Sequence, residues 1–422
     1  MAITIYDQPD TFTPAFNDQV FVVLSDKRTQ DNFKYIFDIW FSGSTSYDIR
    51  VALPPDSGGY GVFDARKIVE DYVSYDITLP DSTALKQNTN SYKGYSIRFG
   101  EEFGLSTSGT TVYAALTSGS TVLAYNSVFG FEDFVDYNQN DWLCDDSSAK
   151  YLTNFPRLNR ASKTIIDIRS SQNAWLHLIT NAQNNVRYVR VATYTAANGG
   201  GSINGNFLIS NDFWGFTSEA DRFLRIPTGT NNLNDIPSGK ITVSVGALPI
   251  IDSDVLSYRI STENSGSTNT SEQIYYNIDD VCTKYEVYRL HFLNKMGGFD
   301  SFNFIRKSRK SSEITRTTSK RLVGERTGTT WGYAKKDRGR LTHHVTDQDR
   351  LTLTTDWIKE TEWLWLKELV TSPEVYWEKS TSVFIAMNVT TVGYEEKKEV
   401  NDNFFTLELQ LDYSYENYRQ RL

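Results

Sequence analysis

The sequence has few of the residues that stabilise small secreted domains, and it has no long apolar runs. Its 422 residues include only two cysteines, Cys144 and Cys282, so no disulfide framework is expected and both are predicted to be buried free thiols. No run approaches the ~20 apolar residues that a membrane-spanning helix needs. The opening residues 1–7 lack the basic and apolar regions of a secretory signal. These absences predict a protein made in a cytoplasm, without membrane insertion.

Recognisable catalytic and metal-binding motifs are also missing. The sequence contains no nucleophile elbow, no P-loop and no zinc-ligand spacing. Residues 136–147 imitate the start of a calcium loop, but Asp141 stands where a glycine is needed and Ser147 stands where a glutamate closes the loop. We therefore predict no enzymatic activity, no metal and no cofactor.

Two groups of titratable residues are candidate sites. Paired acids near aromatic residues could serve a glycosidase, but a chain with 52 acidic residues produces such pairs by chance. The pairs are Glu101–Glu102, Glu132–Asp133 and Asp145–Asp146. His177 and His291 lie inside strand-like runs and are predicted to be core or sheet residues, whereas His343 and His344 are predicted to be solvated or interfacial.

What the chain has in abundance is aromatic residues, with 25 Tyr, 24 Phe and 9 Trp, together with many Thr, Ser and Val. This composition favours strands over helices, and the length favours two or three domains. We predict a mainly β chain of two or three β-sandwich-like modules in series. The predicted modules are 1–138 at the N-terminus, 139–280 in the centre and 281–422 at the C-terminus.

Several elements can be placed within these modules. Residues 20–25 are almost continuously apolar, which predicts a strand buried on both faces. Residues 64–73 predict one short helix that Asp64 caps. A second helix is predicted at about 356–370, capped by Asp356, with its tryptophans buried.

A glycine-containing turn follows the strand-like run 281–293. Gly297 and Gly298 permit positive φ, and the flanking segments alternate aromatic residues, so a hairpin is predicted. The turn residues singled out are Asn294, Gly297, Gly298 and Asp300. A purely structural hairpin with a buried aromatic face is the alternative to a role in assembly.

The next segment is strongly basic, although the whole chain carries a net charge of −9. Between residues 306 and 326, only Glu313 and Glu325 are acidic. The basic residues are Arg306, Lys307, Arg309, Lys310, Arg316, Lys320, Arg321 and Arg326. Too few apolar residues are present for a core, so we predict an extended hairpin arm at about 305–345. Its partner would be an acidic face, or a sheet edge, of another copy.

Two alternatives to this assembly arm remain open. The segment could be a solvated hairpin on its own domain. It could also contact a packaged genome, because phosphates attract any Lys and Arg cluster and Trp331 and Tyr333 could stack on bases.

Short segments along most of the chain resemble known proteins. These are residues 51–56, 59–65, 95–102, 151–156, 293–300 and 372–376. Together they resemble large structural proteins of tailed bacteriophages, particularly those that infect Bacteroidetes-type hosts. The resemblance implies a virion component of the tail (hub, baseplate or tail-barrel ring) or of the head–tail neck. Its partners would be copies of itself in a ring and other tail or neck proteins. A tail protein that binds or hydrolyses host-surface glycans is the alternative function.

Overall fold

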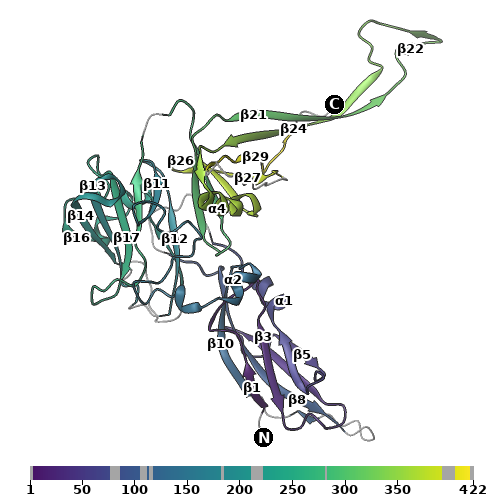
Figure 1. The fold of residues 1–422 in the computed structure, drawn as a ribbon. Coiled ribbons are helices and arrows are strands. Elements are labelled where there is room, and N and C mark those ends of the chain that lie inside the picture. The colour runs from purple at the N-terminus through teal and green to yellow at the C-terminus, as the bar shows by residue number, and fades with distance from the viewer. Residues whose placement is uncertain are drawn as a thin grey trace. The chain divides into compact units, whose positions relative to one another are not determined.

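The computed structural model describes most of the chain, namely residues 3–76, 86–104, 112–113, 117–181, 185–210, 222–280, 283–391 and 404–418. Strands dominate it (Figure 1), and the prediction of a mainly β chain is confirmed. The chain divides into two compact units. The first comprises residues 1–280 and 294–300, and the second comprises residues 281–293 and 301–422. A further boundary near residue 138 stays a prediction.

The first unit begins with two sheets that share one core. A three-stranded sheet has the order β1-β3-β6, and a larger one has the order β2-β10-β8-β4-β5 with β9 beside β8. The strands are β1 Ile3–Asp7, β2 Phe12–Pro14, β3 Val20–Ser25, β4 Lys34–Phe41, β5 Ile49–Leu53, β6 Tyr60–Asp64, β8 Tyr92–Phe103, β9 Val112–Tyr113 and β10 Thr117–Tyr125. Both sheets contribute to the core, in which the Phe37 ring lies 4.9 Å from that of Phe63 and 5.8 Å from that of Phe99.

The prediction that β3 is buried on both faces is wrong. Phe21, Val23 and Ser25 are buried, but the alternate residues Val20 and Val22 are only half-buried. β3 is the middle strand of its sheet, so its backbone is paired on both sides while only one face of the sheet meets the core. The apolar run therefore predicted the strand correctly, but it predicted two buried faces where only one is buried.

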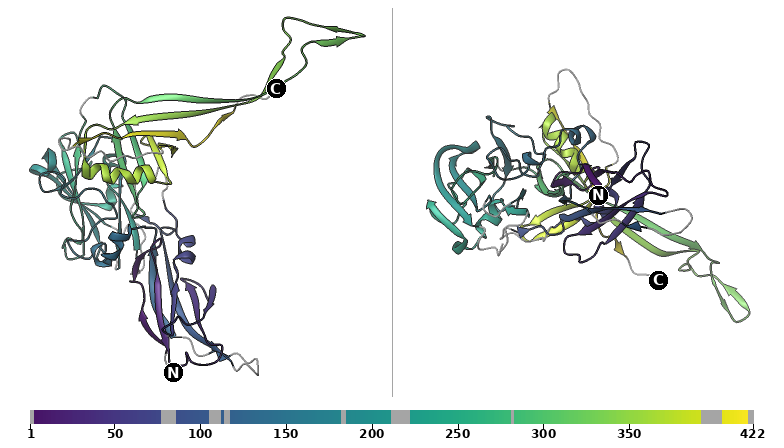
Figure 2. Two further views of the ribbon diagram at one scale, coloured as in Figure 1. Left: turned by 45° about the vertical axis from the view of Figure 1, so that its right-hand side comes forward. Right: turned by 90° about the horizontal axis from the view of Figure 1, so that it is seen from below.

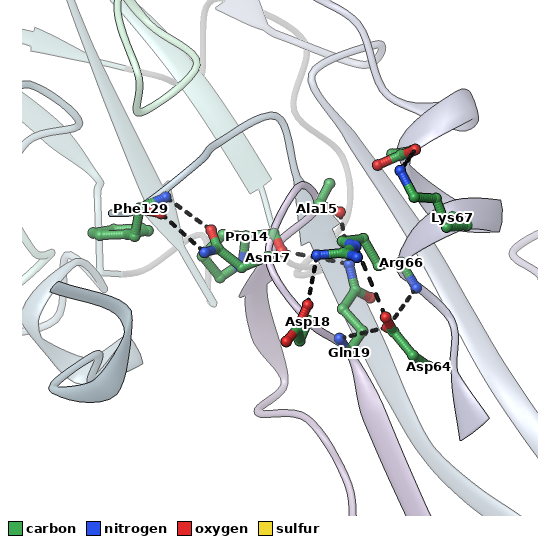
Figure 3. Close-up of polar contacts among 10 residues, drawn as sticks. Pro14, Ala15, Asn17, Asp18, Gln19, Asp64, Arg66, Lys67 and Phe129 are labelled. Carbon is green, nitrogen blue, oxygen red and sulfur yellow. Dashed lines mark hydrogen bonds and ion pairs between the residues drawn. The ribbon is translucent and has the colours of Figure 1, made fainter. Parts of the chain in front are cut away.

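A polar network joins the loop before β3 to the first helix, α1 Arg66–Val69 (Figure 3). Asp64 Oδ1 accepts hydrogen bonds from the backbone N–H groups of Gln19 and Arg66, each at 2.9 Å. Asp64 thus contacts the first turn, as expected, but it lies one residue before the cap, Ala65, and the helix is much shorter than predicted. The 3-10 turn Glu70–Tyr72 follows directly.

The same loop also fixes the segment that precedes the second helix, α2 Phe131–Val135. Asn17 Nδ2 donates to the Phe129 carbonyl at 3.0 Å, and Asn17 Oδ1 accepts from the Phe129 N–H at 2.8 Å (Figure 3). This reciprocal pair holds the backbone immediately before α2. The 3-10 turn Gln139–Asp141 follows the helix.

The rest of the first unit adds two more sheets around a second core. Their orders are β11-β18-β17-β13-β14-β16 and β12-β15-β7. The strands are β7 Lys86–Gln87, β11 Thr164–Ile168, β12 Trp175–Thr180, β13 Tyr188–Ala196, β14 Gly200–Ser210, β15 Arg222–Pro227, β16 Ile241–Val245, β17 Ser257–Glu263 and β18 Ile274–Ile278. The helix α3 Thr230–Asn234 and the 3-10 turns Ala197–Gly199 and Ser238–Lys240 lie between them. Leu178, Val191 and Ile260 come from both sheets and are fully buried in this core.

The second unit is built on one large sheet of order β20-β19-β26-β27-β29-β24-β21, with β30 beside β24. Two small pairs, β22-β23 and β25-β28, complete it. The strands are β19 Tyr288–Leu293, β20 Phe299–Phe304, β21 Arg309–Lys320, β22 Glu325–Thr327, β23 Thr330–Gly332, β24 Arg340–Thr354, β25 Ile358–Lys359, β26 Val375–Ser380, β27 Val383–Val389, β28 Phe404–Phe405, β29 Glu408–Tyr413 and β30 Asn417–Tyr418.

The helix of this unit, α4, spans Glu360–Thr371 and begins later than its sequence suggests. Its N-cap is Lys359, whose backbone N–H donates to the Glu362 carboxylate at 3.2 Å, so the prediction that Asp356 caps it is wrong. Asp356 instead binds Arg306 at 2.5 Å. Trp357 therefore lies outside the helix and is exposed, whereas Trp365 is buried with its ring 5.5 Å from that of Phe292.

Phe37 offers a direct test of the first core. We expect Phe37→Ala to lower the free energy of unfolding of the first unit by about 3–5 kcal/mol, because a fully buried ring would leave a cavity between two sheets. Phe131→Ala is the matched control. That ring is 84% exposed, so its removal should change stability by less than about 0.5 kcal/mol. Denaturant unfolding followed by circular dichroism measures both, and equal losses would contradict this assignment of the core.

Candidate functional site

The predicted turn residues form a buried plug in the first unit. Residues 294–300, called the tip below, belong to that unit although the strands β19 and β20 lead into and out of it. Asn294, Met296 and Phe299 are each less than a twentieth exposed. The tip is therefore a packing element and not an open surface loop.

Asn294 organises the tip from within. Its Oδ1 accepts hydrogen bonds from the backbone N–H groups of Met296 and Gly298, each at 2.9 Å, and its Nδ2 donates to the Leu152 carbonyl at 3.0 Å. An asparagine side chain that bonds its own backbone two residues on is a typical turn device. The remaining predicted residue, Asp300, accepts from the Thr153 hydroxyl at 2.8 Å.

The two glycines are needed because backbone lies directly against them. Gly297 has φ +81°, and a Cβ built there would lie 2.0 Å from the Asn126 carbonyl oxygen. A Cβ at Gly298 would lie 2.8 Å from His177 Nδ1 and 3.0 Å from the Leu152 oxygen. The sequence indicated that both glycines permit positive φ, which only Gly297 adopts, and it carried no signal for these three surrounding residues.

The tip also supports the segment before α2. The Lys295 carbonyl accepts hydrogen bonds from the Val128 N–H at 2.8 Å and from the Ser127 hydroxyl at 2.9 Å. Together with the Asn17 and Phe129 pair, these bonds hold residues 127–129 from two directions.

His177 on β12 contacts the tip through its ring. Its Nδ1 accepts from the Phe299 N–H at 3.3 Å, which requires an unprotonated nitrogen. Burial, followed by the nearby Arg225 charge, lowers the pKa of His177 to about 3. The imidazole is therefore neutral in the folded protein at physiological pH. Its predicted place inside a strand is confirmed.

A second buried histidine belongs to a polar row in the second unit. Ser301 Oγ lies 2.7 Å from His291 Nδ1, and His291 Nε2 lies 2.8 Å from Glu378 Oε2. A hydroxyl, an imidazole and a carboxylate in series resemble the groups that activate a serine nucleophile. Here Arg289 Nε also lies 3.2 Å from the same Glu378 oxygen, and burial lowers the pKa of His291. These contacts satisfy polar groups that a buried sheet face would otherwise leave unpaired.

The acid pairs considered for glycan hydrolysis serve local roles where the structure describes them. Glu101 is buried and accepts from the Ser25 hydroxyl at 2.5 Å. Asp146 accepts from both the backbone N–H and the hydroxyl of Ser148 at 2.6 Å, and these bonds lower the pKa of the Asp146 carboxyl.

No group of three His, Cys, Asp or Glu side chains among the described residues is placed to hold a metal ion. Within the same residues, no helix is long and apolar enough to cross a membrane. Cys144 is free and buried, and burial raises the pKa of its thiol, whereas Cys282 lies outside the described residues.

The basic segment forms a long antiparallel ribbon of β21 and β24 that projects beyond the rest of its sheet (Figures 1 and 2). The register runs from Arg309 opposite Thr352 to Lys320 opposite Arg340. All twelve residues of β21 are exposed, and β21 is the terminal strand of the sheet. At ~3.3 Å per residue the strand alone extends roughly 40 Å.

The base of the ribbon is fastened to its own unit. Arg306 pairs with Asp356, and the Lys310 ammonium lies 3.9 Å from Glu286 and over the rings of Tyr288 and Trp377. A hydrogen bond to Tyr288 raises the pKa of Lys310. These two predicted arm residues therefore have intramolecular partners.

The distal basic residues are freer. Arg321 donates to the Arg338 carbonyl and Arg326 to the Gly328 carbonyl, each at 3.0 Å, and their charges meet no carboxylate in the described chain. Four more predicted arm residues have no ion pair or side-chain hydrogen bond with any described residue: Lys307, Arg309, Arg316 and Lys320. Residues 305–345 hold twelve Lys or Arg and three acids, a net charge of +9, so the remainder of the chain carries −18.

We expect Gly297→Ala to destabilise the first unit by about 3 kcal/mol or more, because it adds a backbone clash to an unfavourable φ. Gly328→Ala is the control, since Gly328 has φ +64° but nothing within 4 Å of its built Cβ. It should cost only about 1–2 kcal/mol, and only in the ribbon. Thermal and denaturant unfolding compare the two, and similar losses would mean that the tip is not tightly packed.

Acid should weaken the first unit through His177. Because its folded pKa of about 3 lies below the unfolded value of 6.5, stability is full above pH 6.5 and falls as the pH drops below it. By pH 5 the loss from this group should be about 2 kcal/mol. His177→Asn keeps an acceptor near Nδ1 but cannot titrate. The difference in pH dependence between wild type and variant, measured by urea unfolding from pH 7.5 to 5, isolates the effect, and parallel curves would refute it.

Comparison with protein-family models finds no family that matches this chain, and comparison with curated proteins finds no match. The function therefore has to be inferred from the chain's own residues and geometry.

Proposed function

We propose that this chain is a non-enzymatic structural subunit of a tailed-bacteriophage virion. It would form part of the tail (hub, baseplate or tail-barrel ring) or of the head–tail neck, as a ring of copies. Its sandwich-like β modules would provide the body of the ring, and the β21–β24 ribbon would be the assembly arm. Its neighbours would be further copies and other tail or neck proteins.

The observation that carries the proposal is the exposed ribbon. A two-stranded hairpin without a hydrophobic face is marginally stable in water, yet β21 is exposed along its whole length. Its outer edge pairs with no other strand of the described chain, and an open strand edge is the feature by which strands add to neighbouring sheets. A partner that covers this edge would explain why so long a ribbon is present.

The charge distribution supports a partner of the same chain. The ribbon segment is +9 and the rest of the chain is −18, so a copy offers acidic surface to the arm of its neighbour. The resemblance of several segments to phage structural proteins supports the virion setting.

The distal ribbon is where the test should be made. Reversing Arg316, Lys320, Lys335 and Lys336 to Glu leaves Arg306 and Lys310, which fasten the base, unchanged. We expect the variant to fold but to self-associate at least tenfold more weakly. Wild-type association should also weaken as salt rises from 50 to 500 mM, because exposed charge contacts are screened over roughly 10 Å or less. Analytical ultracentrifugation measures both effects.

The matched control reverses four exposed lysines outside the ribbon, Lys34, Lys284, Lys367 and Lys379. It makes the same change in net charge, so a general charge effect would weaken both variants equally. Self-association that is unchanged in the ribbon variant would refute the arm. Turnover of a bacterial surface polysaccharide, abolished by one carboxylate substitution, would instead favour the glycan-hydrolysing alternative.

A further inference from the structure

One short helix of the first unit exposes apolar side chains. Phe131 and Val135 lie four residues apart on α2, hence on the same side of the helix, and they are 84% and 68% exposed. Val128, just before the helix, is 42% exposed. Single exposed apolar residues are ordinary, but a group of them marks a contact surface. Phe131, Val135 and Val128 are called the α2 face.

The α2 face is held in place from behind. The Phe129 ring packs edge-on against Tyr137 and Trp142, with centroids 5.2 and 5.9 Å away, and Phe134 stacks on Tyr137 at 6.3 Å. The Asn17 pair (Figure 3) fixes the backbone before the helix, and the Lys295 carbonyl holds it as well. The exposed side chains are thus presented by a fixed segment, which reduces the entropy lost when a partner binds.

Acidic residues surround this face. Residues 127–149 contain six Asp or Glu and no Lys or Arg. Glu132, Asp133 and Asp136 are exposed and form no salt bridge with any described residue. The face therefore suits a partner that combines apolar and basic side chains.

The end of the ribbon has that combination. Residues 321–339, called the ribbon tip, expose Leu322 and Tyr333, 72% and 77% accessible, beside basic residues that include Lys335, Lys336 and Arg338. Trp331 Nε1 donates to the Val323 carbonyl at 2.9 Å, which holds the indole in place.

We propose that the α2 face of one copy binds the ribbon tip of a second copy. Leu322 and Tyr333 pack on Phe131 and Val135. The Lys and Arg residues of the ribbon tip pair with Glu132, Asp133 and Asp136. The inference rests on the proposed function and names the surface that receives the arm. Because the two surfaces are different parts of one chain, the contact is head-to-tail, which closes into a ring or continues as a filament.

Two double variants test the contact. One changes the α2 face, Phe131→Ser with Val135→Ser. The other changes the ribbon tip, Leu322→Ser with Tyr333→Ser. Each should fold normally and self-associate on the order of 30-fold more weakly, the effect of losing a central apolar contact. An equimolar mixture of the two variants should form dimers that grow no further. Each mixed pair retains one intact α2 face, from the ribbon-tip variant, and one intact ribbon tip, from the α2-face variant. Analytical ultracentrifugation of the full chain resolves these species.

Charge reversal gives an independent test of the contact. Glu132, Asp133 and Asp136 changed to Lys should weaken self-association, and adding Lys335, Lys336 and Arg338 changed to Glu in the same chain should restore it. Leu158→Ser with Val383→Ser is the control, because both are exposed apolar residues outside the two surfaces. It should leave self-association unchanged.

The outcomes separate this inference from the proposed function. If the distal ribbon reversals abolish association but the α2 variants do not, the arm stands and the α2 face is not its receiver. A wild-type chain that stays monomeric overturns both proposals. Self-association that neither the ribbon nor the α2 substitutions change also overturns both. If the wild-type chain binds duplex DNA and the ribbon-tip variants lose that binding while self-association is unchanged, the ribbon tip does not dock on a second copy.

Discussion

The close contact between the tip and the backbone around it is the constraint on which the first unit depends. At Gly297 the chain passes so near the Asn126 carbonyl that no Cβ fits, and at Gly298 it lies against His177 and Leu152. Asn294 closes the turn from inside, and the Lys295 carbonyl of the same turn bonds Val128 and Ser127. Such contact works only if the surrounding backbone is equally well held, because interiors are close-packed and transmit displacement.

This constraint extends to α2. The Lys295 carbonyl holds Val128, Asn17 holds Phe129, and the aromatic rings of residues 129, 137 and 142 pack behind the helix. A helix of five residues has almost no stability of its own. Its position therefore comes from these tertiary contacts, and they allow it to keep apolar side chains on the outside.

In the second unit, the basic residues of one pair of strands differ along its length. Those at the base of the ribbon form ion pairs, and those farther along it are exposed. Near its base the ribbon is fastened by Arg306, by Lys310 and by Arg350, which pairs with both Asp412 and Glu313. Beyond Arg350, β24 pairs with β21 and, at Thr346 and Asp347, with β30, and the basic residues of β21 face solvent. A base held by ion pairs and an exposed basic end are what the proposed assembly arm requires.

The sequence by itself determined the features that depend on local chemistry. Its aromatic and β-branched residues favoured strands, Gly297 permitted a positive φ, and the shortage of apolar residues in 305–345 left that segment without a core. What only the tertiary structure decided is which surfaces meet. The one-sided burial of β3 depends on neighbouring strands, and the tip is buried against Asn126, Leu152 and His177, which lie more than a hundred residues away in the chain. The helix α4 begins after Lys359 because Lys359 bonds Glu362, while Asp356 binds Arg306, 50 residues away. Local propensity carries no record of such partners, because packing between distant segments is selected by shape and hydrogen bonding that exist only once the sheets have formed.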